Sequence, residues 1–174
     1  MRTAASEAVS VEQYLKTAYS PDCDYVDGTI EERNVGEFDH AEVQGAMLAW
    51  FRKHDKEWSI HAVPDLRIQV SPTRFRGVDV CLLDRRRPVE QIPKHPPVAV
   101  IEVLSAEDRV SRYRERLADY RRMGIANVWV VDPENRTGYN CSTADWIETT
   151  RFEIKGSPVA VDLAAIFAEL ESNA

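Results

Sequence analysis

Two acidic residues interrupt the most apolar segments of this 174-residue chain. Asp79 lies in the stretch GVDVCLL at positions 77–83, and Glu102 lies in VAVIEVL at positions 98–104. Strands that are apolar throughout belong in the middle of a sheet, where an ionised carboxylate without a partner is costly. On neighbouring strands, which are about 4.8 Å apart, the two carboxylates would also repel each other. A divalent cation held by both would remove these costs, so the sequence predicts a metal site at Asp79 and Glu102.

The ligand types indicate which metal to expect. Mg²⁺ is typically held by one or two carboxylates together with waters and phosphate oxygens. The three cysteines (Cys23, Cys81 and Cys141) are widely spaced, and the sequence has no Cys/His cluster that suits zinc. Mg²⁺ or Mn²⁺ is therefore the expected ion. Two alternatives remain open: each acid pairs with a buried arginine or caps a neighbouring group, or Asp79 ends its strand at the surface.

Arginines accumulate in the segment that follows Glu102. We predict a helix over residues 105–123, because Ser105-Ala-Glu-Asp108 has the spacing of a capping box and Gly124 is a typical stop. Its buried stripe is expected at Val110, Tyr113, Leu117 and Tyr120. Arg109 and Arg116 flank that stripe on one side of the helix. Arginine is suited to bind phosphate with two parallel hydrogen bonds, so this side could bind a phosphate group. The alternative is a solvated face with salt bridges.

The other elements surround these segments. Helices are predicted over 10–18, 39–54 and 162–170, and strands over 24–26, 29–34, 59–63, 66–70, 78–83, 98–104, 127–131, 139–142 and 146–154. The prolines of the segment 84–97 exclude regular structure there. The helix over 39–54 begins at the capping-box spacing Asp39-His-Ala-Glu42, and His40 continues its apolar stripe. This pattern predicts an α/β or α+β fold with a mixed central sheet flanked by helices.

Composition restricts the class of protein. The chain has 22 Lys and Arg against 29 Asp and Glu, a formal net charge of −7. Proteins that coat nucleic acid non-specifically need a basic surface, although a local basic patch remains compatible with this charge. The apolar stretches are far shorter than the roughly 20 residues of a membrane span, and the N-terminus lacks the apolar block of a signal peptide. We therefore expect a cytoplasmic protein with one domain over residues 1–174.

Four stretches carry a resemblance to a known family. In chain order they are DYVDGTIEERNVGEFDHAEVQ, RGVDVCLLD, PPVAVIEVLSAEDR and ERLADYRRMGIANVWVVDP, within roughly residues 22–134. They resemble the Uma-type family of restriction endonucleases, a bacterial branch of the PD-(D/E)XK nuclease superfamily. The resemblance implies a restriction-endonuclease-like core, Asp79 and Glu102 as ligands of Mg²⁺ or Mn²⁺, and hydrolysis of phosphodiester bonds in DNA.

The chain departs from the family pattern at two positions and matches it at a third. Val78 replaces a proline, and Leu104 stands where the superfamily motif has a lysine. The resemblance places the missing positive charge on Arg116, which can stabilise a charged transition state but cannot deprotonate water. His40 matches a histidine of the family, which implies a third active-site group that orients water or the scissile phosphate. The alternative is a histidine that is hydrogen-bonded near a helix N-terminus.

Further charged residues lie beside these segments. Asp24 occurs where the family often has an acid before the Asp27-Gly28 turn, and we interpret it as structural, in a hairpin that covers the site. Arg74, Arg76 and the run Arg85–Arg87 are expected in loops beside the Asp79 strand. There they would contact a nucleic-acid backbone or solvent.

Three functions remain at this point. The leading hypothesis is a magnesium-dependent DNA endonuclease with Asp79 and Glu102 as metal ligands and Arg116 as charge stabiliser. The second is a catalytically weak or inactive binding or assembly module with the same fold, a homodimer through its C-terminal strands. The third is a metal-dependent phosphohydrolase of small molecules.

Overall fold

The computed structural model describes residues 8–33, 36–105 and 110–172. The helices in these ranges are α1 (Val11–Lys16), α2 (Phe38–His54), α3 (Val110–Met123) and α4 (Leu163–Ser172). The strands are β1 (Cys23–Val26), β2 (Thr29–Glu32), β3 (Ile60–Ser71), β4 (Arg74–Asp84), β5 (Ala99–Val103), β6 (Val128–Asp132), β7 (Thr137–Asn140), β8 (Ile147–Thr149), β9 (Arg151–Glu153) and β10 (Ala160–Asp162). None of the helices in these ranges is long and apolar enough to cross a membrane.

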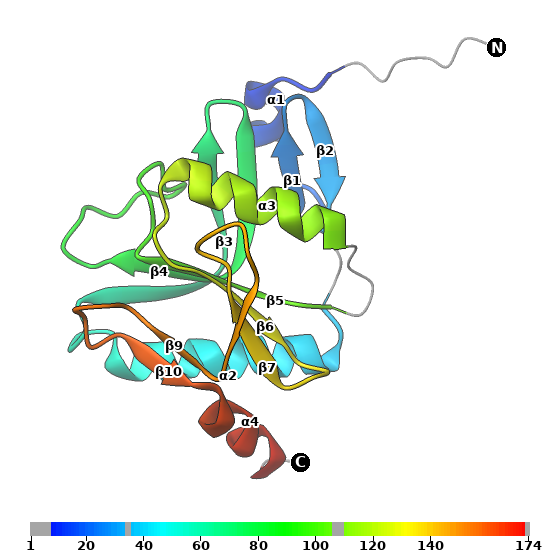
Figure 1. Cartoon of the computed structure of the whole chain (residues 1–174). Helices are drawn as coiled ribbons and strands as arrows, with labels where there is room; N and C mark the ends of the chain where they lie inside the picture. The colour runs from blue at the N-terminus through cyan, green and yellow to red at the C-terminus, as the bar shows by residue number, and fades with distance from the viewer. Residues whose placement is uncertain (1–7, 34–35, 106–109, 173–174) are drawn as a thin grey trace.

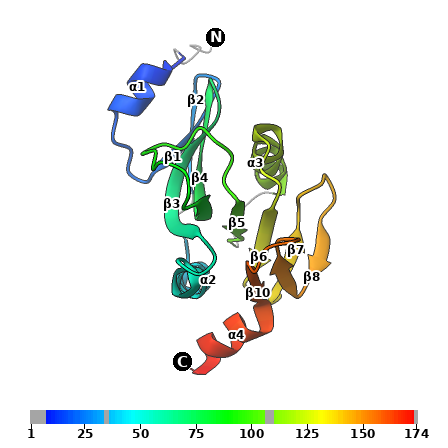
Figure 2. The same cartoon turned by 90° about the vertical axis from the view of Figure 1, so that its left-hand side faces the viewer.

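A large mixed sheet organises the chain (Figures 1 and 2). Its strands follow the order β2-β1-β4-β5-β6-β7-β8, and β3 also pairs with β4. β5 and β6 are parallel and are joined by the crossover helix α3, whereas the other neighbours in this sheet are antiparallel. β9 and β10 form a separate antiparallel pair. This arrangement confirms the predicted fold class, a mixed central sheet flanked by helices.

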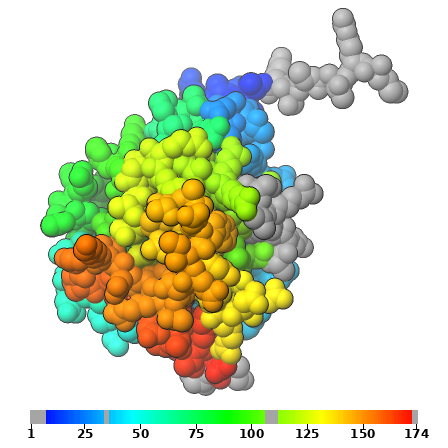
Figure 3. All heavy atoms as spheres, viewed as in Figure 1, coloured from blue at the N-terminus to red at the C-terminus, as the bar shows by residue number. Residues whose placement is uncertain are grey.

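Alternating side chains of the central strands build two hydrophobic layers. On one face, Met47 of α2 and Ile166 of α4 pack with Trp129 of β6. On the other face, Leu117 and Tyr120 of α3 pack on residues that include Val100, Val128 and Val130. The space-filling view shows α3 and the segment with β7 and β8 covering this second face (Figure 3). β5 and β6 are buried on both faces of the sheet, and this explains why their sequences are almost continuously apolar.

β4 changes its neighbour partway along its length. Its start pairs with β1 (Tyr25 opposite Phe75), and its second half pairs with β5 (Val80 opposite Ile101). Residues 76–79 of β4 therefore lie where β1 and β5 separate. Side chains at such a fork meet groups from several elements, and the polar residues of the candidate site gather here.

Several local predictions are confirmed. Ser10 caps α1 in a capping box with Gln13. Tyr113, Leu117 and Tyr120 are buried on α3, and Gly124 follows the helix with a φ of +95°. The segment between β4 and β5 contains no helix or strand. Val110 belongs to α3, but its side chain lies outside the described residues, as does most of the predicted capping box at 105–108.

Two predicted boundaries are wrong. α2 begins at Phe38 with Glu37 as an N-cap that makes no side-chain hydrogen bond, so the capping box at Asp39 is not formed. Asp39 instead lies in the first turn, where its charge favours the helix dipole. The predicted strands 59–63 and 66–70 are one strand, β3, that continues through Pro64. Proline is tolerated because β3 pairs with β4 alone and so forms an edge.

The predicted strand over 146–154 is also divided. β8 joins the large sheet through β7, whereas β9 pairs with β10, which the sequence did not indicate. The Thr149 hydroxyl donates to the carbonyl of Arg151 at 2.8 Å and accepts from its N–H at 3.2 Å. Such local side-chain bonds compete with ladder bonds and turn the chain between the two strands.

Candidate active site

Asp79 lies at the fork of the sheet with 4% of its surface exposed. Arg33 Nη2, from the residue after β2, donates to Asp79 Oδ1 at 2.8 Å. The backbone N–H of Val103 in β5 donates to Oδ2 at 2.8 Å, and His40 Nε2 from the first turns of α2 lies 3.3 Å from the same oxygen. Three separate segments therefore converge on one buried carboxylate.

Glu102 is fully buried on the neighbouring strand β5. The Tyr120 hydroxyl of α3 donates to Glu102 Oε1. Arg116 Nη1, one helical turn earlier, donates to Oε2 at 3.0 Å. The helix that follows Glu102 in the sequence thus returns over the sheet and supplies both partners of its carboxylate.

The pairing of β4 with β5 places the two acids side by side. Val80 and Ile101 are the last pair of this ladder, and Asp79 and Glu102 are the next residues on the two strands, where antiparallel pairing would continue. Facing residues have Cβ atoms roughly 5 Å apart. The strands that carry the two acids are thus neighbours, which is the arrangement in which their charges would repel each other. The arginine pairing that the sequence left as an alternative is also present, since Arg33 contacts Asp79 and Arg116 contacts Glu102.

Asp24 extends this cluster toward the β1–β2 hairpin. It is buried and accepts hydrogen bonds from the Gly77 N–H at 2.9 Å, from Arg76 Nη1 at 3.1 Å and from Arg116 Nη2 at 2.9 Å. Arg116 therefore bridges Asp24 and Glu102. Asp24 holds the hairpin against the site, in agreement with its interpretation as a structural residue.

The predicted positions of Arg74 and Arg76 are wrong. Both lie on β4, and Arg76 is 2% exposed. Arg76 Nη2 lies 2.7 Å from Asp119 Oδ2 and its Nη1 lies 2.9 Å from Glu31 Oε2, while Arg74 Nη1 donates to Asp119 Oδ1 at 3.0 Å. A buried guanidinium held by carboxylates is not free to contact a nucleic-acid backbone.

Two of the three arginines after β4 are also paired within the chain, whereas Arg87 is exposed and makes no ion pair with the described residues. Arg85 Nη2 donates to Asp55 Oδ2 at 2.8 Å, and Arg86 contacts Asp84 through two nitrogens at 2.9 and 3.0 Å. Arg109, which the sequence grouped with Arg116, lies outside the described residues.

The charges of Asp79 and His40 depend on each other. Burial alone would raise the pKa of Asp79, but the hydrogen bond from His40 and the charge of Arg33 outweigh it and lower the pKa. Burial would lower the pKa of His40, but its hydrogen bond to Asp79 and the negative charge of Asp79 raise it. An ionised carboxylate only accepts hydrogen bonds, so His40 Nε2 carries the proton that lies between them.

Glu102 has the opposite tendency. Burial, together with the nearby charge of Asp79, raises its pKa to about 7, although Arg116, Arg33 and the Tyr120 hydrogen bond act against the shift. Two adjacent carboxyl groups thus differ in proton affinity, as is common where carboxylates work together in catalysis.

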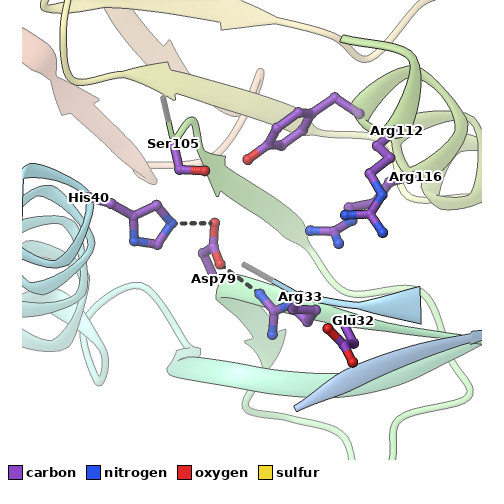
Figure 4. Close-up of a pocket in the computed structure, with 8 residues that line it drawn as sticks. Glu32, Arg33, His40, Asp79, Ser105, Arg112 and Arg116 are labelled. Atoms are coloured by element: carbon purple, nitrogen blue, oxygen red, sulfur yellow. Dashed lines mark hydrogen bonds and ion pairs between the residues drawn. The ribbon is translucent and has the colours of Figure 1, made fainter. Parts of the chain in front are cut away.

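A cavity of about 30 Å³ opens beside Asp79. Figure 4 shows Arg33 and His40 on two sides of Asp79, with Arg112 and Arg116 projecting from α3. The residues that line the cavity are Glu32, Arg33, His40, Asp79, Ser105, Arg112, Tyr113 and Arg116. A cavity of this size holds one ion or one small group of atoms. Its lining is strongly basic around a single buried carboxylate.

The residues present fit a hard divalent cation by their chemistry. Asp79 and Glu102 offer oxygen ligands of the kind that Mg²⁺ and Mn²⁺ prefer. The cavity has room for one ion and is lined by Asp79, whereas Glu102 is buried on the neighbouring strand and does not line it. Within the described residues there is no group of three or more His, Cys, Asp or Glu side chains arranged to hold a metal. Water and substrate phosphate would therefore complete the coordination, and Arg33 would have to leave Asp79.

A pH-dependent stability effect is expected from Glu102. With a pKa raised from 4.5 to about 7, the folded protein binds more protons than the unfolded chain between these values, so Glu102 lowers stability as pH rises through that window. Glu102→Gln removes this loss. In metal-free buffer, the variant should gain roughly 3 kcal/mol of unfolding free energy relative to the native protein between pH 4.5 and 7.

Urea unfolding at several pH values measures this difference. Glu148→Gln, at an exposed position of β8, is the matched control and should show no such trend. A difference between Glu102→Gln and the native protein that shrinks with rising pH would contradict the raised pKa. It would mean that the ionised carboxylate is stabilised by Arg116.

The sequence did not indicate two of the groups that surround the acids. The residue types around Arg33 do not mark it as a site residue, although it lies within the first stretch that resembles the family. Tyr120 was assigned to the buried stripe of its helix, which is correct, but its hydroxyl also contacts Glu102. A buried tyrosine at such a position needs a hydrogen-bond partner, and this was the available signal.

Comparison with known proteins supports the resemblance. Residues 11–159 match the family model Uma2, described as "Putative restriction endonuclease". A crystal structure from Anabaena variabilis, of a "putative nuclease belonging to DUF820", matches 93% of this chain and 99% of its own with a TM-score of 0.78 and 15% identity, which is a likeness of fold. No curated protein matches the chain. Because the family model spans most of the 174 residues, this chain belongs to the Uma2 family.

Proposed function

We propose that this chain is an endonuclease that hydrolyses phosphodiester bonds in DNA with Mg²⁺ or Mn²⁺ held by Asp79 and Glu102. The observation that carries the proposal is that the two buried acids lie on paired strands, each next to the last paired residues Val80 and Ile101, and that Asp79 lines a cavity with three arginines. Membership of the Uma2 family supports a nuclease.

The residues around the acids would divide the work. Asp79 and Glu102 would hold the metal, whose charge would polarise the phosphoryl oxygen and lower the pKa of the attacking water. His40 keeps Asp79 ionised and in place through its hydrogen bond. Arg116 and Tyr120 orient Glu102 from α3. Because a carboxyl group must be ionised to bind a metal, the pKa of about 7 at Glu102 favours binding at and above neutral pH.

The cavity beside Asp79 is too small to enclose a small substrate, whereas a larger cavity of about 430 Å³ shares His40 and Ser105 with it. Pockets that enclose small molecules have volumes of about 300–1,000 Å³, far above the 30 Å³ beside Asp79. A phosphate group of a chain passing over the opening could reach Asp79 while its sugars and bases remain outside. The basic lining attracts phosphate locally despite the net charge of −7.

One observation favours a second candidate, a binding module without catalysis. Both acids already have arginine partners, at 2.8 Å for Asp79 and 3.0 Å for Glu102. Paired acids need no metal to remain buried. The two candidates therefore differ in their need for metal: the nuclease requires a divalent cation, and the binding module does not.

Plasmid nicking separates these candidates. We expect the native protein to convert supercoiled plasmid into open circles with Mg²⁺ or Mn²⁺ and to lose this activity in EDTA. p-Nitrophenyl phosphate should not be hydrolysed under the same conditions. Hydrolysis of the small ester without nicking would favour the phosphohydrolase, and metal-independent DNA binding without cleavage would favour the binding module.

A further inference from the structure

Arg33 lies beside Asp79, where a cation would bind. Its Nη2 is 2.8 Å from Asp79 Oδ1, and its side chain is 13% exposed. It lines the same cavity as Asp79 but comes from the segment that leaves the β1–β2 hairpin. A positive group from outside the central strands thus covers one oxygen of the candidate metal ligand.

The backbone of β4 leaves space for this guanidinium. A Cβ atom placed on Gly77 would overlap Arg33 Nη1 and lie 2.8 Å from Arg33 Cζ. The Gly77 N–H is bonded to Asp24, so the strand is fixed at this point. A side chain at position 77 would therefore force the guanidinium of Arg33 to shift from its present place beside Asp79.

The cavity is lined by three arginines and a histidine but by only two acidic residues, Asp79 and the exposed Glu32. Arg33 and His40 both contact Asp79. Arg112, exposed on α3, lines the same cavity and has no ion pair with any residue that the structure describes. A divalent cation beside Asp79 would be repelled by Arg33 at short range, so its arrival and the departure of Arg33 are coupled.

A released Arg33 would remain at the cavity. A guanidinium has five N–H donors in a planar fork that matches two phosphate oxygens. Arg116 cannot take this role easily, because Asp24 and Glu102 both hold it. Among the arginines that line the cavity in the described part of the chain, Arg33 and Arg112 are therefore the ones that remain available for substrate.

We propose that Arg33 covers Asp79 in the free protein and moves to a phosphate of the DNA when the metal binds. This inference rests on the proposed function, since it needs both the cation and the phosphate. It assigns Arg33 a substrate-binding role and makes Arg33 and the metal competitors for Asp79 in the absence of DNA.

Metal binding without DNA tests the competition. Arg33→Gln should bind Mn²⁺ at least about tenfold more tightly than the native protein in electron paramagnetic resonance titrations, because a charge-assisted contact to Asp79 is lost. Gly77→Ala should act in the same direction, since it displaces Arg33 but retains its charge. Arg86→Gln, at a solvent-exposed pair outside the cavity, and Gly45→Ala, where an added Cβ meets no atom within 4 Å, are the matched controls and should leave the affinity unchanged.

DNA binding tests the second half of the proposal. With Ca²⁺ in place of Mg²⁺ to prevent cleavage, Arg33→Gln should bind a short fluorescent DNA duplex about tenfold more weakly than the native protein. The slope of log affinity against log salt concentration should fall by about one, as expected for one lost phosphate contact. A structural role for Arg33 would not produce tighter metal binding together with weaker DNA binding.

The outcomes distinguish the inference from the proposed function. Unchanged or weaker Mn²⁺ binding in both Arg33→Gln and Gly77→Ala would overturn the role of Arg33, while metal-dependent nicking by the native protein would leave the nuclease intact. The absence of Mn²⁺ binding in the native protein and in both variants would overturn the metal site itself. Thermal unfolding of each variant confirms that it is folded.

Discussion

Asp79→Asn is expected to lower the rate of plasmid nicking by more than about 100-fold, the scale of loss when a group that stabilises transition-state charge is removed. The amide has nearly the shape of the carboxylate but carries no charge, so it should also abolish Mn²⁺ binding. It can still accept the N–H of Val103, which lies 2.8 Å from Asp79 Oδ2. Nicking assays and calorimetric titration with Mn²⁺ measure the two effects.

Asp84→Asn is the matched control for this experiment. Asp84 lies at the end of the same strand, outside the residues that line the cavity, and its partner is Arg86. It should retain nicking and Mn²⁺ binding. Normal nicking by folded Asp79→Asn would show that Asp79 is not a metal ligand and that another site performs any cleavage.

Arg76→Met is expected to have the largest effect on stability. Arg76 is 2% exposed and contacts Asp24, Asp119 and Glu31, so its removal takes one cationic partner from two buried carboxylates, Asp24 and Asp119. Breaking a buried ion pair on one side typically costs about 3–5 kcal/mol. Urea unfolding at neutral pH should therefore show a loss of this size.

A second substitution tests the cause of that loss. Asp119→Asn in the Arg76→Met background removes the charge of a buried carboxylate that Arg76 contacted, and it should recover part of the stability. Arg86→Met removes a solvent-exposed arginine and should show no comparable loss. The contradicting result is additivity. If Asp119→Asn lowers the unfolding free energy as much in the Arg76→Met background as in the native protein, the two residues are not energetically coupled.

The fold could be predicted to a large extent because its signals are local. The apolar runs around Asp79 and Glu102 are buried on both faces of the sheet, and the α3 stripe of Tyr113, Leu117 and Tyr120 packs as its spacing indicates. Predictions failed where tertiary pairing decides the outcome. Pro64 reads as a strand break but lies in a continuous strand, because only one neighbour pairs with β3.

The candidate site could be predicted only in its centre. Two acids in apolar strands could be identified from residue type and position, whereas His40 was indicated by the resemblance to the family. The structure brings Asp79 and His40 together. Arg33 could not be found in this way, because its contact with Asp79 joins residues 46 positions apart and depends on Gly77. Arg76 was placed in a loop, because a charged residue near a turn usually faces solvent.

The location of bound Mn²⁺ tests the central claim most directly. Crystals soaked in Mn²⁺ should show an anomalous peak about 2.1 Å from oxygens of both Asp79 and Glu102, with Arg33 moved away from Asp79. If no peak lies between the carboxylates at saturating Mn²⁺, and Arg33 and Arg116 still occupy them, the acids are structural. The chain would then be a nuclease fold without the metal chemistry proposed for it.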